Sequence, residues 1–175
     1  MSNIQSQRLS LIPLTLEHLN LLSRGRKLLE TSMGLKHSQL EINWDDSFLR
    51  MLDQAINHYI IPNVQVHGVQ YEWFTHWIIV ETATNICIGG IGGSGLPDKN
   101  GQVMLGYYID KKFEGLGYAT EALGAFIRWM RIHPDLISIV ADTPIHHMAS
   151  QKVLGKNGFV LLGEVEDGYR WQLNV

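Results

Sequence analysis

The residues from Tyr107 to Leu123 constrain the fold more than any other stretch of the chain. They predict a strand, a turn that contains Gly115 and Gly117, and then a helix. The glycines remove side chains at the turn, so several backbone N–H groups can point outward together. The first N–H groups of a helix have no partner within it, and the helix dipole adds positive potential there. The stretch therefore predicts a cradle for an anion, most naturally a phosphate or pyrophosphate.

The helix after this turn is the best-defined element of the sequence. Its apolar residues recur at helical spacing, at Ala119, Ala122, Leu123, Phe126, Ile127 and Met130. This stripe predicts a helix that packs on the sheet and holds the turn against the end of the preceding strand. No Lys-Ser or Lys-Thr pair follows Gly117, so the P-loop of a magnesium-dependent nucleotidase is missing. On spacing alone, an ordinary strand-to-helix turn remains the alternative.

Length and composition limit the class of protein. A chain of 175 residues predicts one domain, covering residues 1–175, with a substantial core. The net charge of −3 gives no basic surface for nucleic acid. Cys87 is the single cysteine, which fits a reducing compartment, and no apolar run is long enough to cross a membrane. With no signal peptide in the first residues, we expect a soluble, cytoplasmic protein without a membrane partner.

The order of predicted elements is that of a mixed α/β protein. A short strand at residues 8–13 precedes a helix that Thr15 caps and that runs to about Lys27; a second helix starts at residues 45–47 and stops before Pro62. Residues 29–43 and 63–70 read as irregular. The remaining predictions are strands at 73–82, 86–91 and 102–109 in an antiparallel meander, a helix from Gly117, a strand at 138–143, a helix at 147–156, and strands at 159–166 and 169–173.

The glycines at residues 90–95 match the pattern G-x-G-x-x-G of dinucleotide-binding proteins. That fingerprint needs a helix at its last glycines, whereas loop residues follow here, beginning with Leu96-Pro97. We therefore interpret these glycines as a bulged strand end or a close approach of backbone.

A second segment, from His146 to Phe159, predicts a helix that ends at Gly158 and leads into a strand. Together with the segment from Leu105 to Leu123 and the opening residues Gln7 to Leu19, it resembles the GNAT acyltransferases, in particular the branch of ribosomal-protein N-terminal acetyltransferases. The resemblance covers nearly the whole chain. It implies a predominantly antiparallel central sheet with one splayed pair of parallel strands and flanking helices.

The resemblance also implies acetyl-CoA as the cosubstrate. In the family, backbone amides of the central turn hold the pyrophosphate, and the pantetheine arm lies between the splayed strands. Carried over residue by residue, the cofactor-binding positions are Tyr108, Ile109, Gly115, Leu116, Gly117, Tyr118, Ala119, Thr120 and Ser150. Tyr107 and Tyr118 are interpreted as packing side chains rather than catalysts.

The chain departs from the family at positions that matter for catalysis. Relatives often carry Glu, a candidate general base, where this chain has Met104. A tyrosine that acts as general acid in some members is replaced here by Leu154. His147 occupies the position of a family Asn and is the one candidate catalytic residue, because His titrates near neutral pH. The turn motif begins with Lys112 rather than Arg or Gln, which keeps the charge but loses the planar fork.

The implied function is direct transfer of an acetyl group to a primary amine, either a protein N-terminus or a small amine. The alternatives are a non-catalytic acyl-CoA-binding or sensor module and a nucleotide-binding domain. The histidines show no metal-ligand spacing, so no metal is expected, and Cys87 is interpreted as a core residue rather than a nucleophile. The sequence leaves open whether the protein is a monomer or a homodimer, with Trp73 and Trp77 as candidate interface residues.

Overall fold

A computed structural model describes residues 3–42 and 46–175 of the chain. Within these residues, one sheet contains eight strands in the order β1-β2-β3-β4-β5-β6-β8-β7. The strands are β1 (Ile4–Gln5), β2 (Leu9–Pro13), β3 (Trp77–Glu81), β4 (Ile86–Gly93), β5 (Gln102–Ile109), β6 (Ser138–Pro144), β7 (Val160–Val165) and β8 (Gly168–Asn174). Every neighbouring pair is antiparallel except β5 and β6, which are parallel and are joined by a crossover helix.

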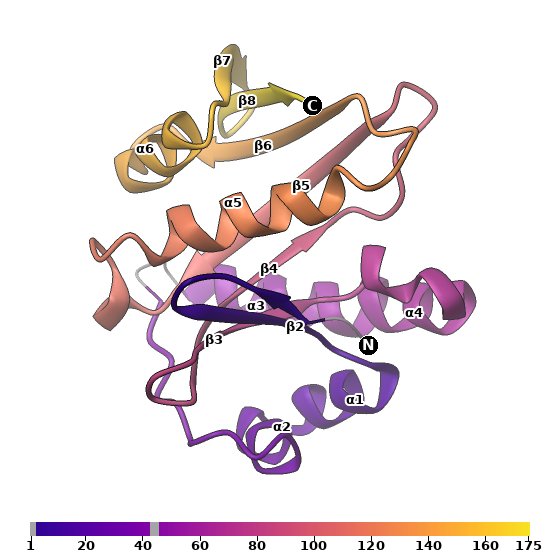
Figure 1. The fold of residues 1–175 in the computed structure, drawn as a ribbon, viewed down its shortest axis with the longest axis vertical. Helices are drawn as coiled ribbons and strands as arrows, with labels where there is room; N and C mark the ends of the chain where they lie inside the picture. The colour runs from indigo at the N-terminus through magenta and orange to yellow at the C-terminus, as the bar shows by residue number, and fades with distance from the viewer. Residues whose placement is uncertain (1–2, 43–45) are drawn as a thin grey trace.

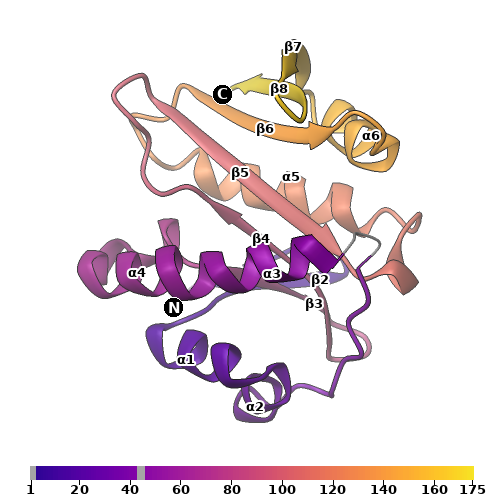
Figure 2. The ribbon, with the colours of Figure 1, turned by 180° about the vertical axis from the view of Figure 1, so that it is seen from behind.

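Helices cover both faces of the sheet (Figures 1 and 2). The crossover helix α5 lies on one face, and α3 and α4 lie on the other. The helices are α1 (Leu16–Arg24), α2 (Arg26–Ser32), α3 (Asp46–Ala55), α4 (Ile61–His67), α5 (Tyr118–Met130) and α6 (Met148–Lys156), with a π-helical turn η1 (Ile56–Ile60) and 3₁₀ turns η2 (Gly68–Trp73) and η3 (Lys111–Phe113). The predicted mixed α/β fold, with a mainly antiparallel sheet and flanking helices, is confirmed.

The parallel pair β5–β6 is splayed, as predicted. Its register joins Gln102 to Ser138, Val103 to Ile139 and Met104 to Val140, and in the described part of the chain no further pair follows. Figure 2 shows the two strands diverging toward α6. Because the ladder stops in the middle of the sheet, backbone groups of both strands face an open gap there.

The apolar stripe of α5 builds the core that supports this gap. Leu123, Phe126 and Met130 are at most 1% exposed. Trp77 of β3 meets Phe126 edge to face, with ring centroids 5.6 Å apart. Trp73 and Trp77 are 8% and 0% exposed, so the prediction that they form an exposed interface is wrong. They belong to the layer between sheet and helix, where their large apolar rings lie out of water.

The first half of the chain departs most from the predicted elements. The first predicted helix breaks into α1 and α2 at Gly25, whose φ of +148° is a conformation that glycine adopts readily. The predicted stop before Pro62 is wrong, because η1 leads directly into α4. The Ile61 N–H donates to the Ile56 carbonyl, and Pro62 follows in the first turn of α4, where a missing N–H costs little.

The two segments predicted to be irregular also contain helix. Helix α2 extends into the first of them as far as Ser32, and α4 and η2 occupy the second. No helix among the described residues is both long enough and apolar enough to cross a membrane.

Candidate active site

Two cavities meet at the splayed strands. The turn cavity, of about 390 Å³, lies between the end of β5, the start of α5 and the face of α6. The large cavity, of about 790 Å³, lies between β5, β6, the π-helical turn η1 and the β7–β8 turn. Tyr107, Tyr108 and Ser150 line both cavities, so the two spaces adjoin across these side chains.

The turn cavity has a floor of main-chain donors. Gly115 and Gly117 have φ angles of +74° and +83°, and α5 starts directly after Gly117 without a side-chain cap. Among residues 3–42 and 46–175, no acceptor pairs with any backbone N–H of residues 115–120. Successive unpaired N–H groups at a helix N-terminus favour an anion. These N–H groups are available to an anion, and the binding of one at this turn stays a prediction.

Five of the predicted cofactor positions on this turn line the turn cavity: Gly115, Gly117, Tyr118, Ala119 and Thr120. Leu116 differs from them, since its side chain is 56% exposed and does not line the cavity. Its carbonyl accepts a hydrogen bond from Arg8 Nη1 at 3.1 Å, and its N–H has no acceptor among the described residues.

Arg8, just before β2, braces the turn from behind. Its Nε donates to Glu121 Oε2 at 2.7 Å, and its backbone N–H donates to Glu121 Oε1 at 2.7 Å. The guanidinium also lies 4.1 Å from the centroid of the Tyr118 ring. Burial raises the pKa of Glu121, but the hydrogen bonds from Arg8 and Ser6 outweigh it and hold that pKa below its ordinary value.

Charged and titratable side chains of α6 face the turn cavity. Lys152 and Lys156 line it, together with Glu114 and His147. His147 is the residue before α6, and desolvation lowers its pKa while the charge of Glu114 acts in the opposite direction. His147 therefore lies beside the anion cradle, and the lining of the large cavity does not include it. Its catalytic role stays a prediction.

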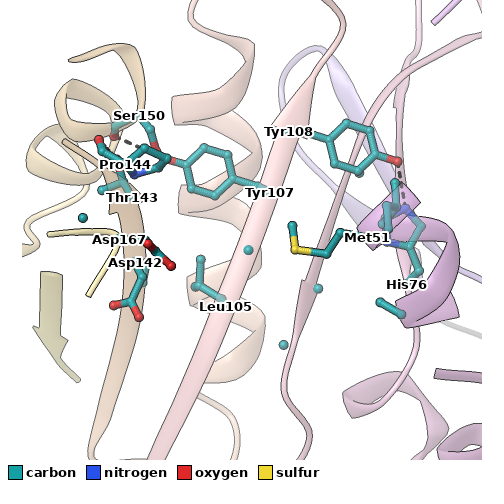
Figure 3. Close-up of a pocket in the computed structure, with 18 of the residues that line it drawn as sticks. Met51, His76, Leu105, Tyr107, Tyr108, Asp142, Thr143, Pro144, Ser150 and Asp167 are labelled. Carbon is teal, nitrogen blue, oxygen red and sulfur yellow. Dashed lines mark hydrogen bonds between the residues drawn. The ribbon is translucent and has the colours of Figure 1, made fainter. Parts of the chain in front are cut away.

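Tyr107 and Ser150 span the gap between β5 and α6. The Tyr107 hydroxyl lies 2.9 Å from Ser150 Oγ and donates to the Ser150 carbonyl at 3.2 Å. Figure 3 shows the Tyr107 ring extending from β5 toward Ser150 and Pro144. Burial raises the pKa of Tyr107 to about 12, so its hydroxyl is protonated at neutral pH. Two hydroxyls are thus fixed where the cavities adjoin.

The strand register decides which backbone groups of β5 face the gap. The Ser94 N–H donates to the Met104 carbonyl at 2.8 Å, and the Asp110 N–H donates to the Ile88 carbonyl at 2.7 Å. Because hydrogen bonding alternates along an antiparallel strand, even-numbered residues of β5 bond to β4 and odd-numbered ones face β6. Of the two predicted pantetheine contacts, Ile109 thus directs its backbone polar groups into the gap, whereas those of Tyr108 face β4.

The Tyr108 side chain belongs to a buried polar cluster at the opposite wall of the large cavity. Its hydroxyl lies 3.1 Å from His76 Nε2, and the two rings are stacked (Figure 3). Burial, helped by the nearby Arg26 cation, lowers the pKa of His76 to about 4, so the imidazole is neutral at physiological pH. A Cβ on Gly90 would lie 2.3 Å from His76 Cε1. Gly90 is therefore needed for close approach, as predicted for these glycines.

Met104 lies where the parallel pairing ends and is 39% exposed. On β5, the first residue that lines the large cavity is the next one, Leu105. Cys87 is 1% exposed, and burial raises the pKa of its thiol, which agrees with the predicted core role. Within the described ranges 3–42 and 46–175, no three His, Cys, Asp or Glu side chains are arranged to hold a metal ion.

Sequence reasoning missed the roles of Arg8, His76 and the Tyr107 hydroxyl. Their partners lie 113, 32 and 43 residues away, so spacing along the chain gave no local signal. The Gln7 to Leu19 segment was part of the family resemblance, but nothing in it indicated that Arg8 contacts the turn.

Comparison with known proteins identifies the family. The family described as "Acetyltransferase (GNAT) domain" matches residues 8–160 of the chain. The chain belongs to the GNAT acetyltransferase family. An uncharacterized N-acetyltransferase of Bacillus subtilis (strain 168), YjdG, is 33% identical over 98 residues, which is 56% of this chain and 58% of that protein. The aligned part thus spans little more than half of that relative.

Solved structures share this GNAT fold. Ribosomal-protein-S5-alanine acetyltransferase from Vibrio fischeri has a TM-score of 0.69 at 18% identity, with 99% of this chain and 97% of that chain covered. RimL, the ribosomal L7/L12 alpha-N-protein acetyltransferase in complex with coenzyme A, has a TM-score of 0.65 at 19% identity, covering 99% and 98% of the two chains. At these identities the likeness concerns the fold, and it includes the branch that the sequence resembled.

Proposed function

We propose that this GNAT domain, formed by residues 1–175, transfers an acetyl group from acetyl-CoA to a primary amine. The observation that carries the proposal is that an anion cradle and a large cavity adjoin at the splayed strands, with Tyr107 and Ser150 between them. A cosubstrate bound at the cradle and extended along the gap would present its thioester to the large cavity. That cavity then holds the amine.

The residues of the turn cavity fit a diphosphate ester. The unpaired N–H groups of residues 115–120 would accept the pyrophosphate, and Lys152 and Lys156 would add positive charge. In the gap, the backbone polar groups of Tyr107 and Ile109 would pair with the amides of the pantetheine arm, as a neighbouring strand would. Ser150, also predicted as a cofactor contact, would lie beside the thioester.

The reaction needs few protein groups. The neutral amine nitrogen attacks the thioester carbonyl carbon, the carbon–sulfur bond breaks, and the sulfur leaves as a thiolate that takes up a proton. One proton is lost overall, because the amine starts as an ammonium ion. A backbone N–H of β5 that faces the gap, at Leu105 or Tyr107, would stabilise the oxyanion. The Tyr107 and Ser150 hydroxyls would hydrogen-bond the departing sulfur, and placing the amine beside the thioester supplies much of the acceleration.

A non-catalytic acyl-CoA-binding module is the second candidate. The observation that favours it is Met104, which cannot accept a proton where relatives often carry Glu. Met104 does not line the large cavity, so in an active enzyme the amine would lose its proton to solvent or to another group in the cavity. The rate of an active enzyme should then rise with pH toward the pKa of the amine.

Release of free thiol from acetyl-CoA, measured across a panel of amines, separates the two candidates. An acetyltransferase releases thiol in proportion to acetylated amine found by mass spectrometry. A binding module binds coenzyme A in calorimetry without amine-dependent release. Binding that ATP or NAD displaces as well as coenzyme A does would contradict both candidates and favour a nucleotide-binding domain.

A further inference from the structure

The large cavity has one apolar wall. It is built on α3 and the turn η1, which run along one face of the sheet (Figure 2). The side chains on this wall are Met51, Leu52, Ala55, Tyr59 and Ile60, with Leu105 of β5 facing the cavity as well. The Tyr59 hydroxyl is engaged with the Ser94 carbonyl at 2.8 Å, so its ring, rather than its polar group, is available to a ligand. The described side chains from α3 and η1 on this wall carry no charge.

The wall across the gap is acidic. Asp142 of β6 and Glu166 and Asp167 of the β7–β8 turn line the cavity, together with Arg170 of β8. Arg170 Nε and Nη2 donate to the two Asp142 oxygens at 2.8 and 2.7 Å, so these two charges neutralise each other. Glu166 and Asp167 form no ion pair with any residue in the described part of the chain.

Glu166 and Asp167 both line the cavity, and Figure 3 shows where the Asp167 carboxylate lies. Figure 3 shows its side chain at the β6 side of the gap, beside Asp142, with Leu105 and Tyr107 across from it on β5. An ammonium group held there lies in the gap between β5 and β6, in the cavity that Tyr107 and Ser150 also line. The rest of the molecule would extend toward the apolar wall.

We infer that the acceptor is a monocationic primary amine on an apolar body, and that Asp167 determines this specificity by binding the ammonium group. The inference rests on the proposed function and names the substrate class of its acceptor site. A polyamine or an aminoglycoside that extends across the cavity from Asp167 would place a second cation against the wall of α3 and η1, where no described group compensates it. Two kinds of molecule have this chemistry. One is a peptide N-terminus whose first side chain is apolar, and the other is a free alkyl amine.

The test compares matched amines on the full chain with acetyl-CoA. We expect kcat/KM for 3-methylbutylamine to exceed that for 1,4-diaminobutane by about tenfold. Asp167→Asn should raise KM for the monoamine about fivefold and leave kcat nearly unchanged. Glu164→Gln removes an exposed carboxylate of β7 that does not line the cavity, and it serves as the matched control. Met51→Asp should reduce the ratio of kcat/KM for 3-methylbutylamine to kcat/KM for 1,4-diaminobutane.

A peptide that begins with Leu distinguishes the two sources of this chemistry. Acetylation of the peptide in preference to 3-methylbutylamine assigns a protein N-terminus, and the reverse assigns a small amine; both agree with the inference. Preference for 1,4-diaminobutane, or an unchanged KM in Asp167→Asn, would overturn it.

Failure of the proposed function is a separate outcome. If no amine releases thiol, calorimetry of 3-methylbutylamine with the protein saturated with coenzyme A still decides the inference. Binding that weakens in Asp167→Asn and not in Glu164→Gln supports an amine site in a protein without transferase activity. Absence of amine binding contradicts the amine site itself.

Discussion

The two cavities of this protein are built by different parts of the polypeptide. The turn cavity takes its anion-binding groups from the main chain of one contiguous stretch, residues 115–120, at the start of α5. The large cavity takes its character from side chains of α3, η1, β5, β6 and the β7–β8 turn. The main-chain donors of the turn cavity are local in sequence, although α6 closes that cavity, whereas every wall of the large cavity depends on the packing of distant elements.

This difference teaches which part of the chemistry each site can specify. A main-chain N–H is present whatever side chain the residue carries, so the turn cavity depends mainly on backbone conformation. Gly115 and Gly117 provide that conformation. The large cavity depends on which side chains line it, and so it can select one class of amine over another. Variants should therefore separate cosubstrate binding from acceptor recognition.

The largest effect is expected from Gly117→Asp. Within the described part of the chain, a Cβ added there has Arg8 Nη2 as its one neighbour within 4 Å, at 3.6 Å, and the carboxylate places negative charge at the predicted anion site. Coenzyme A affinity should fall at least about 100-fold in calorimetry. Gly117→Asn is the control for strain, since it places an uncharged side chain of the same size at the same positive φ, of +83°. Equal affinity loss in both variants would mean that strain, not charge, is responsible.

Gly90→Ala should perturb the large cavity and spare the turn cavity. The added methyl would meet the His76 ring at 2.3 Å and Tyr108 Cζ at 2.8 Å. Overpacking of this kind should lower the free energy of unfolding by about 1–3 kcal/mol in urea denaturation. Gly106→Ala, where nothing lies within 4 Å of the added Cβ, should leave stability nearly unchanged. If Gly90→Ala weakens coenzyme A binding as much as amine use, the two sites are not separable.

Tyr107→Phe tests the junction between the cavities. Losing the hydroxyl that contacts Ser150 should lower kcat by about tenfold and change the KM for acetyl-CoA little. Steady-state kinetics with a working amine measures both values. Tyr169→Phe removes a hydroxyl from β8 outside both cavities and should leave kcat unaltered. A normal kcat in Tyr107→Phe would assign the hydroxyl to packing alone.

The smallest effect is expected from Arg8→Lys. Lysine keeps the charge but cannot bond the Glu121 carboxylate and the Leu116 carbonyl together as the guanidinium does, and it loses the ring contact with Tyr118. Coenzyme A affinity should fall about threefold to fivefold, because the turn is less firmly held.

The same variant makes a prediction about pH. The folded-state pKa of Glu121 lies below the ordinary value of 4.5, so this carboxylate stabilises the fold above pH 4.5, and the contribution is lost as pH falls through the folded pKa. The stability difference between wild type and Arg8→Lys should therefore shrink below about pH 4.5 in urea denaturation. A difference that stays constant down to pH 3 would exclude the Arg8–Glu121 contacts as its cause.

The regular elements after residue 100 could be predicted because their signals are local. The strand at Gln102–Ile109 has the predicted bounds, and α5 begins directly after Gly117. The helices before residue 76 were less predictable. The π-helical turn η1 leads directly into α4, and Pro62 lies in the first turn of α4, where a proline does not interrupt the helical run.

The sequence by itself determined the glycine turn and the start of α5, because the glycines at 115 and 117 and the apolar stripe of α5 act over a few neighbouring residues. Tertiary structure alone decided the rest of the site. The register of β4 on β5 directs the backbone of Ile109 rather than Tyr108 into the gap, and packing brings Arg8 to Glu121 and Asp167 to the β6 side. Such contacts join residues far apart in the chain, so they exist only once the sheet has assembled.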